Sequence, residues 1–172
     1  MRAAVKLLVL AMLPVLLSAC VLQSAVPVFT EDQAKLVLGS TATAMQSYSW
    51  KNGAWAAEED PLTLSVEGQH YIAKDKDSAV SLAFVPLHGN WFAVQAVEAR
   101  KAAVYTLAVV ENRTAILHVL SCSDLKKRTA LDPYVEYKDD DCFIKAGASA
   151  MALFVELIKA PGEPSMKLEP AG

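Results

Sequence analysis

Three cysteines, three histidines and one serine among small residues are the side chains of this chain that chemistry would first be expected to use. A nucleophilic serine needs a sharp turn between glycines, yet Gly147-Ala148-Ser149-Ala150-Met151 lacks the second glycine. Glycine-rich phosphate loops and the HExxH zinc motif are also absent from the sequence. Because no nucleophile, base and orienting group stand at recognisable spacing, we expect the protein not to be an enzyme.

The histidines and the acidic run do not have the spacing of a metal site. His70 and His118 fall on expected strands, and His88 falls in an expected turn. Two of them could meet an aspartate across a sheet, but zinc sites normally use three or four ligands. Asp139-Asp140-Asp141 offers consecutive carboxylates, which do not converge on Ca²⁺ as alternate loop positions do. We therefore expect neither a metal nor a cofactor.

The first twenty residues have the pattern of an export signal that ends in a thiol. Arg2 and Lys6 form a basic start without acidic residues, and an apolar run follows over residues 7–17. This run is about half as long as the roughly 20 apolar residues that a bilayer-spanning helix needs. Two small residues then precede a cysteine in Leu17-Ser18-Ala19-Cys20.

Leu17-Ser18-Ala19-Cys20 resembles the lipobox of bacterial lipoproteins at every position. The resemblance implies a diacylglycerol thioether on Cys20, cleavage before this residue and acylation of the freed amino group. It also implies anchoring in the bacterial envelope, and Val21 in place of an aspartate indicates the outer membrane, facing the periplasm or the surface. The resemblance covers only the leader. The alternatives are a secretory signal with an incidental cysteine and a buried N-terminal helix.

Removal of residues 1–19 leaves 153 of the 172 residues, which is enough for one domain with a substantial core. The leader carries two positive charges, so the formal charge changes from −3 for the whole chain to −5 for the mature chain. Without a basic surplus, nucleic acid is not an expected partner. Cys122 and Cys142 remain in a compartment that permits disulfides, and we expect a structural bridge between them.

Residues 47–56 carry the strongest local signal in the mature chain. Asn52-Gly53 tolerates the positive φ angles of a type I′ turn, so Trp50 and Trp55 would face each other across two strands. Such a pair either staples a hairpin or offers a stacking surface to a ring-bearing ligand. We favour the staple, and we keep Trp50, Trp55 and Trp91 as candidate ligand or contact aromatics.

Apolar residues then alternate with other residues along six segments separated by turns, which predicts an antiparallel meander. The segments are Leu62–Glu67, His70–Lys74, Ala79–Leu87, Trp91–Glu98, Ala103–Val110 and Thr114–Ser121. Their connections are too short for crossover helices, so a parallel sheet is not expected.

Capping residues predict two helices around this meander. Thr30 and Gln33 have the spacing of a capping box, which predicts a short helix that ends at Gly39. Ser149 is the expected N-cap of a helix over Ala150–Ala160. On that helix, Met151, Phe154, Val155 and Ile158 would share one face.

The expected fold class is α+β and mainly β. We predict an antiparallel β-meander or half-barrel of about six to eight strands, closed by one C-terminal helix. Along the chain we expect a signal peptide over residues 1–19, a lipidated tether over 20–29, a single β-rich domain over 30–160 and a disordered tail over 161–172.

Our first hypothesis for the function is a non-catalytic, lipid-anchored envelope protein that presents a small β domain for a structural role or for contact with another envelope protein. The alternative is a binder of a small apolar ligand, similar in outline to lipocalins, and an enzyme comes third. A cavity of about 300 Å³ or more would favour the ligand binder. A solid core with an exposed apolar or aromatic patch would favour the contact role.

Overall fold

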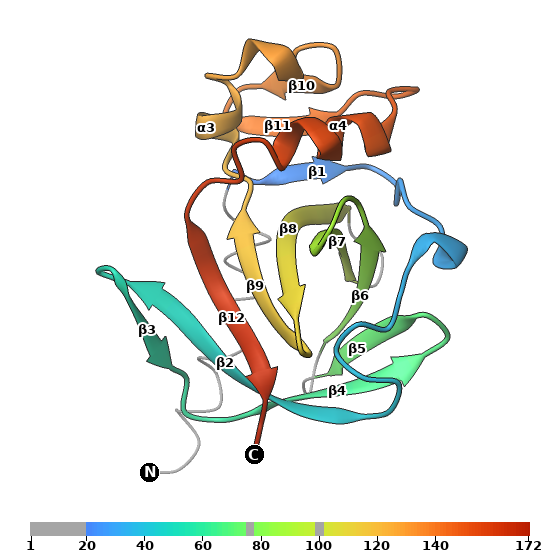
Figure 1. Cartoon of the computed structure of the whole chain (residues 1–172). Helices are drawn as coiled ribbons and strands as arrows, with labels where there is room; N and C mark the ends of the chain where they lie inside the picture. Colours follow the sequence, from blue (N-terminus) through green and yellow to red (C-terminus); the bar gives the residue numbers. More distant parts are fainter. Residues whose placement is uncertain (1–19, 75–77, 99–101) are drawn as a thin grey trace.

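The computed structural model describes residues 20–74, 78–98 and 102–172. The predicted signal peptide, including Leu17-Ser18-Ala19, lies outside these residues, and Cys20 is the first residue described. Within the described part, the chain is mainly β: strands close into a barrel, and a smaller layer of strands and helices packs beside it (Figure 1).

Eight of the described strands form a closed antiparallel barrel. In ring order they are β2 (Thr43–Lys51), β4 (Leu62–Glu67), β5 (His70–Lys74), β6 (Ala79–Pro86), β7 (Trp91–Glu98), β8 (Ala103–Glu111), β9 (Thr114–Val119) and β12 (Pro164–Pro170). The six predicted segments are confirmed as β4 to β9, to within two residues at each end. The hairpin is confirmed as well, because β2 pairs with β3 (Ala54–Ala57) around Asn52 and Gly53, whose φ angles are 53° and 80°.

β12 closes the barrel, so the predictions of a half-barrel and of a disordered tail over residues 161–172 were wrong. It pairs with β2 on one side and with β9 on the other. Leu168 is 2% exposed and packs inside, whereas Lys167 lies over an aromatic ring on the outside. Pro164 and Pro170 stand at the ends of the strand, where a missing N–H disturbs the ladder least. Only the few residues between these prolines alternate between apolar and polar, so the proline-rich composition led to the prediction of a disordered tail.

β1 (Leu22–Ser24) lies where a tether over residues 20–29 was predicted, so that prediction was also wrong. It pairs antiparallel with β8 and parallel with β11 (Asp141–Ile144), and β11 pairs with β10 (Val135–Lys138). Leu22 is completely buried. The parallel pair also corrects the expectation of a purely antiparallel sheet. The two strands come from opposite ends of the domain, so no short connection limits their direction.

The side chain of Gln95 fixes the segment that follows β1 to the outside of the barrel. Its Oε1 accepts hydrogen bonds from the N–H groups of Val28 and Phe29, both at 3.0 Å, and its Nε2 donates to the Phe29 carbonyl at 3.1 Å. Gln95 is only 4% exposed. One amide therefore satisfies three backbone groups of Val28 and Phe29, where this segment becomes buried.

The second layer covers the barrel wall and has its own apolar core. It contains β1, α3 (Cys122–Leu125), η2 (Thr129–Leu131), β10, β11 and α4 (Ala150–Leu157). Figure 1 shows α3, α4, β10 and β11 on the far side of β1 from the barrel strands. The C-terminal helix, α4, thus belongs to this layer, so the prediction that it would close the sheet was wrong.

One of the two predicted helices is present as α4, and the other is reduced to a single 3-10 turn. α4 begins as predicted, because Ser149 Oγ accepts a hydrogen bond from Ala152 N–H at 3.2 Å. Its buried residues are Leu153, Phe154 and Leu157, whereas Met151 and Val155 from the predicted face are exposed. The predicted helix before Gly39 is only η1 (Glu31–Gln33), one 3-10 turn. Beyond it the chain is held extended, since Lys35 N–H donates to the Phe84 carbonyl at 2.8 Å.

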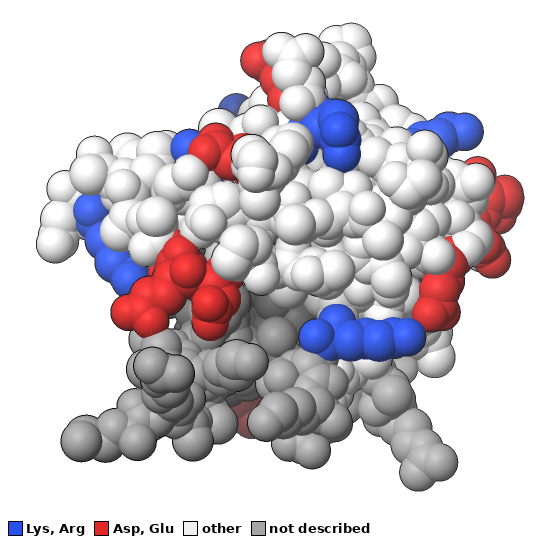
Figure 2. All heavy atoms as spheres, turned by 90° about the horizontal axis from the view of Figure 1, so that it is seen from below, with Lys and Arg blue, Asp and Glu red and all other residues white. Residues whose placement is uncertain are grey.

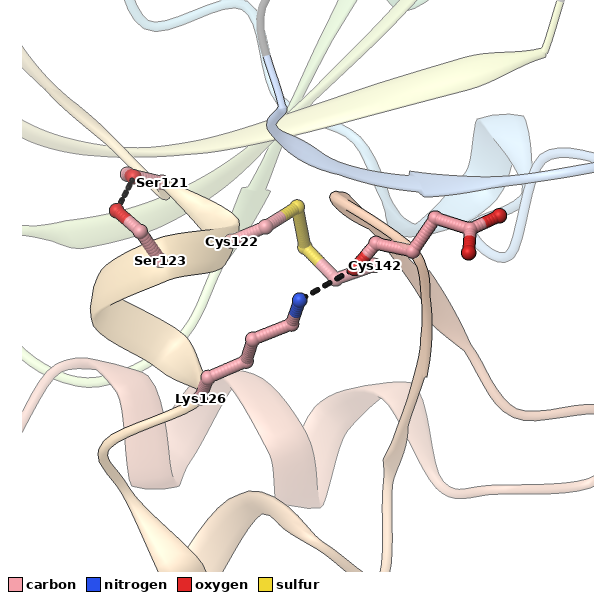
Figure 3. Close-up of a disulfide and its surroundings, with 6 residues drawn as sticks. Ser121, Cys122, Ser123, Lys126 and Cys142 are labelled. Atoms are coloured by element: carbon pink, nitrogen blue, oxygen red, sulfur yellow. Dashed lines mark hydrogen bonds between the residues drawn. A yellow bond between two sulfur atoms is a disulfide. The ribbon is translucent and has the colours of Figure 1, made fainter.

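The disulfide Cys122–Cys142 is present as predicted and joins α3 to β11 (Figure 3). The two Cα atoms are 5.4 Å apart, and both cysteines are completely buried. Beside the bridge, Lys126 Nζ donates to the Asp139 carbonyl at 2.5 Å. The bridge therefore joins the element that leaves the barrel after β9 to the strand beside β1.

We expect Cys122→Ser and Cys142→Ser each to lower the free energy of unfolding by about 3 kcal/mol, because the bridge closes a loop of 20 residues in the unfolded chain. Thermal unfolding followed by circular dichroism would measure the loss. The double variant should be no less stable than either single variant, since one bond is lost in all three. A melting temperature that does not respond to a reducing agent would contradict this expectation.

Candidate functional site

The interior of the barrel is packed at one end. There the strand ends contribute Val66, Tyr71, Phe84 and other apolar residues, and Leu38 fills the end of the barrel. The Tyr71 hydroxyl accepts a hydrogen bond from Leu38 N–H at 2.8 Å and donates to the Gly39 carbonyl at 2.9 Å. Arg113 Nε donates to the Leu38 carbonyl at 2.9 Å. The residues Leu38 and Gly39 thus close this end of the barrel, and we call them the plug.

The opposite end contains an apolar cavity of about 60 Å³ that is partly open. Its wall comes from the matching ends of antiparallel strands and from the residue before β1, and it includes Val21, Leu62, Val80, Ala96, Val119 and Met166. Deeper in the barrel, Leu82, Val94 and Leu117 form its floor. The exposed atoms of the wall are almost all carbon, so the cavity suits an apolar group and offers no anchoring charge.

Cys20 lies at the rim of this cavity. Its carbonyl accepts a hydrogen bond from Cys122 N–H at 2.7 Å, and Val21 pairs with Ser121 in an isolated antiparallel β-bridge. Val21 is 4% exposed and lines the cavity, whereas Cys20 is exposed. The predicted acylation site is therefore one residue from the cavity wall, with no spacer between them.

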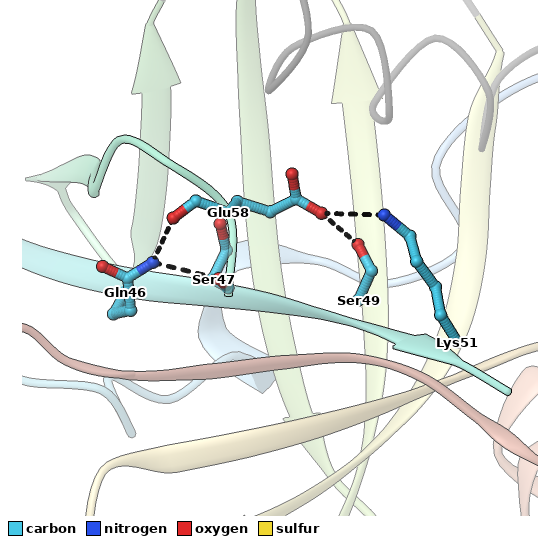
Figure 4. A network of polar contacts seen from close by, with 5 residues as sticks. All are labelled: Gln46, Ser47, Ser49, Lys51 and Glu58. Atoms are coloured by element: carbon cyan, nitrogen blue, oxygen red, sulfur yellow. Dashed lines mark hydrogen bonds and ion pairs between the residues drawn. The ribbon is translucent and has the colours of Figure 1, made fainter. Parts of the chain in front are cut away.

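A polar cluster stands at the same end of the barrel, where the chain bends between β3 and β4 (Figure 4). Ser49 Oγ donates to the Glu58 carboxylate, which also lies 3.7 Å from Lys51 Nζ. Gln46 Nε2 donates to the Glu58 carbonyl at 2.7 Å. Ser47 is 5% exposed, and its hydroxyl has no hydrogen-bond partner among the described residues. This cluster fixes the bend beside the cavity.

The predicted aromatic residues lie outside the barrel and form two separate groups. Trp50 and Trp55 face each other across the hairpin, with ring centroids 4.9 Å apart. Trp91 instead packs 5.3 Å from the ring of His118. None of the three tryptophans lines the cavity described above. The Trp50–Trp55 pair thus has the geometry of a hairpin staple.

Lys167 extends the outer aromatic surface around the hairpin. Its Nζ lies 4.0 Å from the centroid of the Tyr48 ring and 3.0 Å from a Glu169 carboxylate oxygen. The hydrogen bond that the Tyr48 hydroxyl donates to Glu169, and then the one from Lys167, hold the pKa of this carboxyl below its usual value. The charges of this surface are thus paired locally.

Metal ligands do not gather anywhere in the described part of the chain. No group of three or more His, Cys, Asp or Glu side chains is placed there to hold a metal ion. His118 Nδ1 lies 3.0 Å from the Gly162 carbonyl, and Asp139 occupies a turn with φ of 55°. Arg128, from the basic run 126–128, donates to the carbonyls of Glu156 and Ala160 at the end of α4, at 2.6 and 3.0 Å.

Two further observations concern the charges on one face of the molecule and the length of its helices. Seen from below, Figure 2 shows acidic and basic side chains interspersed over a mainly uncharged face in its described part. In residues 20–74, 78–98 and 102–172, no helix is both long and apolar enough to cross a bilayer.

The sequence interpretation missed the cavity. Leu82 and Val94 belong to strands that alternation predicted correctly, but their inward face becomes a cavity wall only when β12 closes the ring. The relevant signal was Met166 and Leu168, which alternate with Ser165 and Lys167 near the end of the chain.

In comparisons with known proteins, the chain matches no family model, no curated protein and no solved structure.

Burial raises the pKa of the Tyr71 phenol, which favours the neutral form in the folded protein. The stability contributed by this group is complete below its ordinary pKa of about 10 and is lost as the pH rises through the folded value. We expect the melting temperature to fall above about pH 10, and Tyr71→Phe to make this fall shallower while costing about 1–2 kcal/mol at neutral pH. Melting curves across alkaline pH would test this, and equal slopes in both proteins would contradict it.

Proposed function

We propose that this protein is a lipid-anchored envelope protein whose barrel binds the end of a slender apolar chain. The observation that carries the proposal is the cavity inside the closed barrel, whose wall is apolar on every side described. The closed barrel is compatible with our alternative hypothesis of a binder similar in outline to lipocalins, although the cavity is too small to enclose a whole small molecule.

The size of the cavity limits what it could bind. At about 60 Å³ it is well below the roughly 300 Å³ at which pockets begin to enclose whole small molecules. A few methylene groups would fit, each contributing about 0.8 kcal/mol when buried. Met166 lies in the wall, and its unbranched side chain can change rotamer to let a chain enter further. A hydrocarbon chain thus fits better than a rigid ring system.

The proposed role is binding without catalysis. Only Tyr105 and Thr106 carry hydroxyl groups among the described residues that line the cavity. The Tyr105 hydroxyl is engaged by Ser24 at 2.6 Å, and Thr106 Oγ1 donates to the His118 carbonyl at 2.5 Å. Both groups are therefore occupied in structural hydrogen bonds and are not placed to act as nucleophile or base.

A contact role for the outer surface is the second candidate. Met151 and Val155 are one helical turn apart on α4 and are 37% and 42% exposed. Exposed apolar side chains at this spacing could pack against another envelope protein. The two roles use different faces of the molecule, so variants in the cavity and on α4 separate them.

Filling the cavity tests the binding proposal. We expect Ala96→Leu to weaken binding of a fluorescent fatty-acid analogue at least about tenfold, because three added carbons would occupy the space that the chain needs. The titration would use the chain from residue 20 with Cys20→Ser, which keeps the other described residues and removes the anchor.

Ala44→Leu is the matched control, because Ala44 is exposed on the outside of β2 and receives the same added carbons. Its affinity should equal that of the parent chain. Equal affinities in all three proteins would place the probe elsewhere and refute the cavity as the binding site.

The anchor is tested at its thiol. We expect Cys20→Ala to abolish incorporation of radiolabelled palmitate and to leave the leader uncleaved, since the resemblance to a lipobox makes this sulfur the acylation site. Cys122→Ser is the control, because it breaks the disulfide and leaves Cys20 intact. Normal labelling of Cys20→Ala would refute the anchor.

A further inference from the structure

The position of Cys20 determines which end of the barrel lies near the lipid that it would carry. Consecutive Cα atoms are about 3.8 Å apart, so the anchor begins a few ångströms from the cavity wall at Val21. Hydrogen bonds fix the backbone on both sides of Val21. The Cys20 carbonyl accepts one from Cys122 N–H, and Leu22 N–H donates another to the Leu120 carbonyl at 3.1 Å. The mouth of the cavity cannot turn away from the anchor without breaking these bonds.

We propose that the open mouth of the barrel faces the membrane that holds Cys20, and that the cavity takes in the end of an acyl chain from a lipid of that membrane. This inference rests on the proposed function, since it names the ligand of the same cavity and the source of that ligand.

The two ends of the barrel are unequal in a way that supports this orientation. The plug closes one end through Leu38, which is completely buried and is held by Tyr71 and Arg113. The cavity opens at the other end, where Cys20 lies. Ligand access and membrane anchor therefore share one end.

The physical advantage of this arrangement is a short path for the ligand. Each methylene that leaves a bilayer for water loses the free energy of apolar burial. When the mouth lies against the bilayer, an acyl chain can pass from one apolar environment to another with little exposure. The described residues of the wall offer no charged partner for a headgroup, so we expect the headgroup to stay at the membrane surface.

The test uses the full lipidated protein in vesicles of phosphatidylethanolamine and phosphatidylglycerol. A small share of phosphatidylcholine in these vesicles carries a diazirine near the end of one acyl chain. After illumination, we expect tandem mass spectrometry to find crosslinks on cavity residues such as Leu82, Leu117 or Met166. Ala96→Leu should remove these crosslinks, and Ala44→Leu should keep them.

A spacer variant tests the orientation itself. Insertion of about twelve Gly and Ser residues between Cys20 and Val21 would separate the anchor from the rim by roughly 20 Å on average. We expect this insertion to reduce the cavity crosslinks at least about fivefold, because the local concentration of lipid at the mouth falls with the length of the tether. The same insertion between His88 and Gly89, in the exposed turn between β6 and β7 at the plugged end of the barrel, is the control and should leave the yield unchanged.

The outcomes separate this inference from the proposed function. If the soluble chain binds the free fatty-acid analogue but vesicle lipid never reaches the cavity, the proposed function stands and the orientation is wrong. If crosslinking appears only after the spacer is inserted, an acyl chain on Cys20 itself fills the cavity, which also overturns the inference. Equal crosslinking with and without the spacer would show that proximity to the anchor does not matter, and the inference would fail.

Discussion

The backbone pairing of β12 between β2 and β9 is the constraint on which the rest of the molecule depends. An open sheet would leave two edges with unpaired N–H and C=O groups, and it would have no enclosed interior. With β12 in place, the inward residues of eight described strands surround a single space. Leu38 of the plug and Tyr71 of β5 fill one end of that space, and the other end holds the cavity.

Much of this fold could be predicted from local patterns, and the missing parts share a physical cause. Alternating residues predicted β4 to β9, Asn52-Gly53 predicted the hairpin, and Ser149 predicted the start of α4, because these signals act within a few residues. β1 was missed because it has only three residues, and β12 was missed because it lies in a proline-rich segment; both strands pair with partners far along the chain. The cavity was missed with them, since its wall needs both ends of the chain.

The candidate site itself was predictable only in part. Cys20 was recognised from its neighbours, but its position at the rim follows from the pairing of β1 with β8 and β11. The tryptophans were candidate ligand or contact residues because of their large aromatic rings, but Trp50 and Trp55 pack against each other outside the barrel. The cavity wall depends on residues with no chemical signature, such as Ala96 and Val21. The apolar cavity therefore leaves little trace in the types of residue.

The locations of β1 and β12 also have a consequence for biosynthesis. β1 begins two residues after Cys20, the predicted acylation site, and β12 is the last strand that the structure describes. Ribosomes release the chain from the N-terminus, so the barrel cannot acquire its last wall until β12, which follows the seven other barrel strands in the chain, has been synthesised. Contacts of such long sequence separation form slowly. An incomplete polypeptide is therefore kept from closing its barrel for as long as β12 is missing.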